Sequence, residues 1–197
     1  MNTLRLLLFS AASSLLITGC HVSSHNHQNG NKVDIGTPFG SLHVKTNDKA
    51  QVAGLGITPY PGAVPYKGDN DDTDSADVNL SFGSFHLGVR AASYKTPDGE
   101  DPVLAFYKKD LGRYGEVLEC EHDKPVGEPT HTSQGLTCSE DNHSYHHSTV
   151  HTGSHLELRA GSPQHQHIVA VEEKDGGTKI GLVALDLPEH HDSSDKE

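Results

Sequence analysis

Residues 77–96, DVNLSFGSFHLGVRAASYKT, alternate apolar and polar side chains over almost their whole length. This period of two is typical of half-buried β-strands and constrains the fold more than any other feature of the chain. The apolar positions are even-numbered from Val78 to Phe82 and odd-numbered from Phe85 to Val89. Gly83 stands where this phase slips by one, which predicts a β-bulge or a tight bend within the strand.

The same letters occur earlier in the chain. FGSLH at 39–43 is repeated as FGSFH at 82–86, and an Asp-apolar pair precedes both copies at the same offset. Pro38 cannot donate a hydrogen bond to a sheet, so residues 37–40 are predicted to form a turn or bulge between short strands. We expect two equivalent hairpin ribbons, either paired with each other or at opposite edges of a sheet. The alternative is convergence, because amphipathic strands with Phe-Gly turns resemble one another.

One helix is predicted immediately after this region. Asp101 suits the N-cap, Pro102 suits the first helical position, and Gly115 suits the position just past the C-terminus. Apolar side chains between them recur at spacings of four, four and three and predict one buried stripe. These side chains are Val103, Tyr107, Leu111 and Tyr114.

Further strands are predicted after the helix. Asp175-Gly176 separates the last two and is a strong hairpin signal. A helix between two sets of strands predicts an α+β fold, an antiparallel β-sheet with one packed α-helix. The predicted strands cover 116–120, 135–138, 155–160, 167–173 and 178–187.

The N-terminal residues have the pattern of an export signal. Arg5 is their only charged residue, and the apolar run 6–17 is too short for a membrane span, which takes about 20 residues. The run ends in Ile-Thr-Gly-Cys at 17–20, which resembles the lipobox of bacterial lipoproteins. That resemblance implies that residues 1–19 are a signal peptide and that Cys20 is acylated, with palmitate among the chains. The residue after the cysteine is His21 and not aspartate, which in Gram-negative bacteria resembles lipoproteins sent on to the outer membrane. The resemblance therefore implies a location in the outer membrane, facing the periplasm or the cell surface.

The alternative is an ordinary secretory signal with a chance cysteine. Under the lipobox interpretation, the rest of the chain divides simply. Residues 20–32 are predicted to be a lipidated, flexible tether and 33–188 a single α+β domain. An acidic loop at 67–77 interrupts this domain and does not fit a calcium-binding EF-hand. Residues 189–197 are predicted to be a polar, disordered tail.

The chain has three cysteines. Assigning Cys20 to the lipid leaves Cys120 and Cys138, and an oxidising envelope favours a disulfide between them. Two free thiols, or a metal held together with histidines, are the alternatives.

The formal net charge of −12 argues against a nucleic-acid partner, because phosphate backbones are bound by Lys and Arg. It also argues against electrostatic binding to anionic lipid. The expected partners are therefore the membrane, to which the lipid anchor attaches the protein, and an unknown envelope protein.

Three stretches also follow one another in an order that resembles a known protein family. Tyr-Pro-Gly-Ala at 60–63 is followed by a strand and then by the V-x-x-F-Y helix that contains residues 103–107. This order resembles a family of uncharacterised bacterial envelope lipoproteins. The resemblance implies a small domain of sheet plus helix and brings no activity, so it assigns no catalytic residue.

Histidines are the one set of residues in the sequence whose spacing suggests a binding site. Four of them recur every four residues, and neutral imidazoles suit Zn, Ni or Cu. A spacing of four places them on one face of either a strand or a helix. The alternative is a solvated, His-rich surface, since Ser, Thr, Gly and Asn lie between them. The four are His143, His147, His151 and His155.

No G-x-S-x-G elbow and no glycine-rich phosphate loop is present in the sequence. We therefore expect a lipid-anchored envelope protein that is not an enzyme and needs no cofactor, with a binding or structural role. The alternative is a periplasmic, His-rich protein that binds or buffers transition metals.

Overall fold

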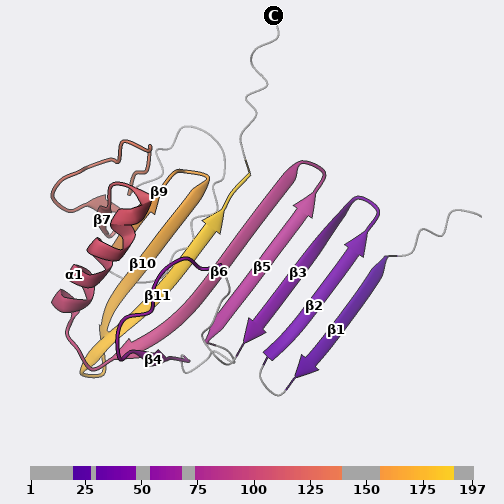
Figure 1. The fold of residues 1–197 in the computed structure, drawn as a ribbon, viewed down its shortest axis with the longest axis horizontal. Helices are drawn as coiled ribbons and strands as arrows, with labels where there is room; N and C mark the ends of the chain where they lie inside the picture. The colour runs from indigo at the N-terminus through magenta and orange to yellow at the C-terminus, as the bar shows by residue number, and fades with distance from the viewer. Residues whose placement is uncertain (1–19, 28–29, 48–53, 68–73, 139–155, 189–197) are drawn as a thin grey trace, which may run out of the picture.

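In the computed structural model, the described residues are 20–27, 30–47, 54–67, 74–138 and 156–188. They form one antiparallel sheet with a single α-helix on one side, so the predicted α+β fold is confirmed (Figure 1). The predicted signal peptide and the predicted polar tail lie outside these ranges.

The sheet runs in the order β1-β2-β3-β5-β6-β11-β10-β9-β7-β8, and the short β4 pairs with β6. Its strands are β1 (His21–His27), β2 (Gly30–Thr37), β3 (Gly40–Asn47), β4 (Val64–Pro65), β5 (Ser75–Phe82), β6 (Phe85–Thr96), β7 (Leu118–Glu121), β8 (Lys124–Pro125), β9 (Leu156–Gly161), β10 (His165–Lys174) and β11 (Gly177–Asp186). The C-terminal strand β11 therefore lies in the middle of the sheet, between β6 and β10.

The two sequence copies form two neighbouring hairpins. β2 and β3 join through Pro38-Phe39, β5 and β6 join through Gly83-Ser84, and β3 pairs with β5 along its length. Gly83 therefore makes the tight bend that the phase slip predicted. The ribbons pair with each other, and Figure 1 shows both turns at the same end of the sheet.

Helix α1 (Glu100–Leu111) continues into a 3-10 turn, η1 (Gly112–Tyr114), which ends at Gly115 with φ of 127°. The predicted N-cap was wrong. Gly99 occupies that position without a side-chain cap, and Asp101 lies within the first turn, where its negative charge suits the helix dipole.

The predicted apolar stripe of α1 is confirmed, because it packs into the main core. Val103, Tyr107 and Leu111 are fully buried against side chains of β9, β10 and β11. Leu55 and Ile57 cover the same side of the sheet next to α1, as the purple segment in Figure 1 shows. The core therefore lies under the C-terminal strands and not under β1–β3.

β10 and β11 are joined by the predicted Asp175-Gly176 turn. Lys174 pairs with Gly177, and the two turn residues have φ of 51° and 73°. This left-handed geometry matches the right-handed twist of the flanking strands and favours Asp-Gly.

Two sequence predictions need correction. Residues 20–32 were expected to be a tether, yet β1 covers residues 21–27 and pairs with β2. An edge strand can be polar, because it is held by backbone pairing with one neighbour, and β1 buries little: Val22, opposite Ile35, is itself exposed. Residues 135–138 were expected to be a strand but form an irregular segment that follows a turn. Of the acidic loop, residues 68–73 lie outside the described part, and β5 already begins at Ser75.

Candidate functional site

The predicted lipidation site lies at the start of the edge strand. Cys20 is exposed and is the one free cysteine among the described residues. The next residue, His21, pairs with Gly36 near the end of β2. A chain attached to Cys20 would leave the sheet at the end where the two hairpin turns lie.

Cross-strand pairs give the sheet two different faces. Partners opposite each other point to the same side, so the side that carries α1 also carries the charged side chains of β2, β3 and β5. The second side carries an apolar row that crosses the N-terminal strands and is only partly buried. This row runs through Val22, Ile35, Leu42, Leu80 and Leu87.

On the helix side, the first hairpin holds a small ion cluster. Asp34 Oδ1 lies 2.6 Å from His43 Nδ1, and Asp34 Oδ2 lies 2.7 Å from Lys32 Nζ. The hydrogen bond to His43 and then the one to Lys32 lower the pKa of the Asp34 carboxyl to about 2. Asp34 is therefore held as a carboxylate with both oxygens occupied, which does not suit a general base.

The second hairpin holds a related group. Arg90 Nη1 donates to Asp186 Oδ2 at 2.8 Å, and Arg90 Nε lies 3.9 Å from Asp77 Oδ1. His165 Nδ1 lies 3.0 Å from the other oxygen of Asp186. Burial opposes ionisation of Asp186, but the hydrogen bonds from His165 and Arg90 outweigh it and lower its pKa. Both oxygens of Asp186 are therefore occupied, as those of Asp34 are.

His167 packs as part of the helix-side surface. Its ring stacks on Tyr114 with centroids 3.6 Å apart, and the Tyr114 hydroxyl donates to the Gly56 carbonyl. Burial, followed by the nearby Arg113 guanidinium, lowers the pKa of His167. Tyr114 therefore joins the 54–57 segment to η1, and the neutral imidazole of His167 supports the Tyr114 ring from β10.

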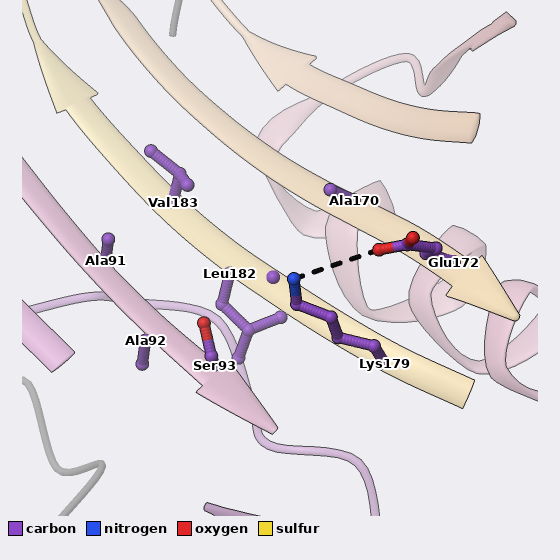
Figure 2. Close-up of a pocket in the computed structure, with 9 residues that line it drawn as sticks. Ala91, Ala92, Ser93, Ala170, Glu172, Lys179, Leu182 and Val183 are labelled. Atoms are coloured by element: carbon purple, nitrogen blue, oxygen red, sulfur yellow. Dashed lines mark ion pairs between the residues drawn. The ribbon is translucent and has the colours of Figure 1, made fainter. Parts of the chain in front are cut away.

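The second side of the sheet has a shallow hollow of about 160 Å³ at its centre (Figure 2). Small residues from three adjacent strands make its floor, among them Ala91, Ala170 and Gly181. Lys179 Nζ and Glu172 Oε2, 3.8 Å apart, border it. Besides this ion pair, the Ser93 hydroxyl lines the hollow, but among the described residues no hydrogen bond connects it to a base, and the hollow is too open to exclude water from a reaction.

The cysteine prediction is confirmed by the structure, which joins Cys120 of β7 to Cys138. Arg159 fixes the same segment from the sheet. It donates to Glu157 Oε2 at 2.6 Å and to the Thr137 and Cys138 carbonyls at 3.4 and 3.3 Å. Sequence reasoning missed this nearly buried ion pair, because alternating charged residues on β9 look like an exposed strand face.

The predicted metal ligands His143, His147, His151 and His155 all lie outside the described residues. Within the part of the chain that is described, no group of three or more His, Cys, Asp or Glu side chains is placed to hold a metal ion. The metal interpretation stays a prediction.

The described residues also contain no helix long and apolar enough to cross a membrane. Comparison of the chain with protein-family models, with curated proteins and with solved structures found no match.

Proposed function

We propose that this chain is a lipid-anchored protein of the bacterial cell envelope with a non-catalytic binding or structural role. The observation that carries the proposal is the position of Cys20. Its thiol is exposed and free just before the edge strand, whereas the other two cysteines are paired. An acyl group on Cys20 would therefore extend from the edge of the sheet without disturbing a core residue.

The polar groups of the sheet support the non-catalytic part of the proposal. The carboxylates of Asp34 and Asp186 are each occupied by two cationic or histidine side chains. A nucleophile or general base needs an unoccupied, suitably placed lone pair. The partly buried apolar row on the second side is a more suitable surface for contact with another molecule.

The anchor is tested by expressing the full chain in a Gram-negative bacterium fed an alkyne analogue of palmitate. We expect labelled protein in the membrane fraction and an N-terminal peptide that begins at acylated Cys20. Cys20→Ser should lose the label, because the acceptor thiol is gone. Cys120→Ala with Cys138→Ala keeps Cys20 and should remain labelled. An intact leader, or an unacylated soluble wild type, would contradict the proposal.

A further inference from the structure

The exposed apolar side chains gather at one end of the sheet. Six large apolar residues are exposed in the part of the chain that the structure describes, and four of them lie at the end where β1 begins. Phe39 is 75% exposed, Phe82 60% and Phe85 41%. The fourth is Val22, next to His21 on β1. Of the other two, Val64 begins β4 and Val126 follows β8, and both lie away from this end.

The strand register places these residues on one edge together with the predicted anchor. Across the strands, His21 pairs with Gly36, Thr37 with Gly40, Gly40 with Phe82, and Phe82 with Phe85. Adjacent strands lie about 4.8 Å apart, so the edge from β1 to β6 is about 20 Å long. Figure 1 shows the start of β1 and both hairpin turns at this end.

This edge is uncharged in an otherwise acidic chain. Residues 37–42 and 80–87 contain no Asp, Glu, Lys or Arg, although the chain has 27 acidic residues. The nearest carboxylate of the first hairpin, Asp34, is paired with Lys32 and His43. The edge can therefore approach a lipid surface without burying an unpaired charge.

The first turn also satisfies its own backbone amides. Thr37 Oγ1 accepts hydrogen bonds from the Phe39 and Gly40 amides at 3.3 and 3.0 Å and donates to the Gly40 carbonyl at 3.0 Å. Pro38 has no amide to satisfy. Unpaired backbone groups are costly in lipid, so this closed turn is suited to a region of low polarity.

The Phe82 ring lies against Gly40, its partner on β3. A Cβ on Gly40 would come within 2.8 Å of the Phe82 ring, so glycine lets the ring lie over the neighbouring strand while most of it stays exposed. Aromatic and aliphatic side chains on such a surface enter the boundary between lipid head groups and acyl chains to a depth of about 5–10 Å.

We propose that this edge, formed by the tips of the two hairpins, contacts the lipid bilayer and holds the sheet end-on to the membrane. The proposal rests on the lipid anchor at Cys20. The acyl chains hold the protein at the membrane, and Phe39, Phe82 and Phe85 fix its orientation there. The repeated Phe-Gly sequence then has a physical role, because each copy supplies one tip.

The chain contains no tryptophan, so a single introduced tryptophan reports its own surroundings. Full-length Phe39→Trp, Phe82→Trp and Val64→Trp proteins are purified from membranes and reconstituted in vesicles of phosphatidylethanolamine and phosphatidylglycerol. Val64 is the matched control, because it is also 60% exposed but pairs with Lys95, about 30 Å along β6 from Phe85. We expect blue-shifted emission, and quenching by lipids brominated on the acyl chains, for the two tip variants and not for Val64→Trp.

Mass spectrometry of the N-terminal peptide separates the two proposals. Acylated protein whose tip tryptophans emit and quench like Val64→Trp would overturn the end-on contact and leave the anchor standing. This includes the case in which the tips bind a protein, since the vesicles contain only lipid. Protein without an acyl group would overturn both proposals. If Phe82→Trp does not fold, Phe39→Trp still decides, because Phe39 lies in an exposed turn.

Discussion

At the scale of single residues, each N-terminal hairpin carries an ion pair across its strands. Asp34 pairs with His43 in the first, and Asp77 lies near Arg90 in the second. Both pairs are symmetric about their turns, and both lie on the same side of the sheet as α1. They make this side of each ribbon polar, whereas the opposite side carries the apolar row.

The Asp34 cluster predicts a pH dependence of stability. The pKa of Asp34 is lowered from 3.8 to about 2 in the folded protein, so its ion pairs stabilise the fold above about pH 4 and are lost as the pH falls towards 2. We expect Asp34→Asn to weaken the dependence of the unfolding free energy on pH in this window. Urea unfolding at a series of pH values measures it.

Asp123→Asn is the matched control for this change, because Asp123 is exposed in a turn where asparagine also tolerates φ of 61°. The control should keep the pH dependence of the wild type. The same pH dependence in Asp34→Asn and the wild type would contradict the prediction.

The pairs Asp34–His43 and Asp77–Arg90 could be predicted from the sequence once the two turns were assigned. With Pro38-Phe39 as the turn, residues 34 and 43 must face each other, and with Gly83-Ser84 the same holds for 77 and 90. The contact between Asp186 and Arg90 could not be predicted from the sequence, because it depends on β11 pairing with β6 almost a hundred residues away.

At the scale of elements, the sequence predicted regular segments better than their ends. The stripe of α1 is set by the 3.6-residue period, which is a property of the whole helix. Its N-cap depends on local backbone geometry at Gly99, which composition does not determine. β1 was missed because an exposed edge strand has weak alternation, and only its pairing with β2 identifies it.

The disulfide joins strand β7 to the irregular segment that contains Cys138. It closes a separation of 18 residues and both cysteines are only 2% exposed. We expect Cys120→Ala with Cys138→Ala to lower the unfolding free energy by about 3 kcal/mol, because the unfolded chain regains the entropy of the open loop. Urea unfolding of the purified domain measures it, with Cys20→Ser as the control that keeps the bridge. An unchanged midpoint would contradict the prediction.

At the scale of the whole molecule, the two halves of the sheet are supported differently. The cores on both sides lie mainly over β6, β9, β10 and β11, whereas the apolar side chains of β2 and β3 remain partly exposed. The sequence predicted an α+β sheet but not this asymmetry, which follows from where α1 packs.

We therefore expect backbone amides of β10 and β11 to exchange hydrogen much more slowly than those of β1 and β2, because local opening costs less where less apolar surface is buried. Hydrogen exchange followed by mass spectrometry measures this on peptides. The disulfide-deficient variant controls for the β7 region and should keep the contrast. Equal protection of the two halves would contradict it.

The position of β11 also decides when the chain can assemble. Among the described strands, β11 links the N-terminal ribbons to β10 and β9 in the hydrogen-bonded order of the sheet. On one side, residues 88–96 can pair early with β5 and β4, but on the other side they must wait for residues 178–186 to be made. Contacts so distant in sequence slow folding. The main core therefore cannot close until the chain has been synthesised as far as β11, because Ile180, Leu182 and Ala184 of that strand belong to it.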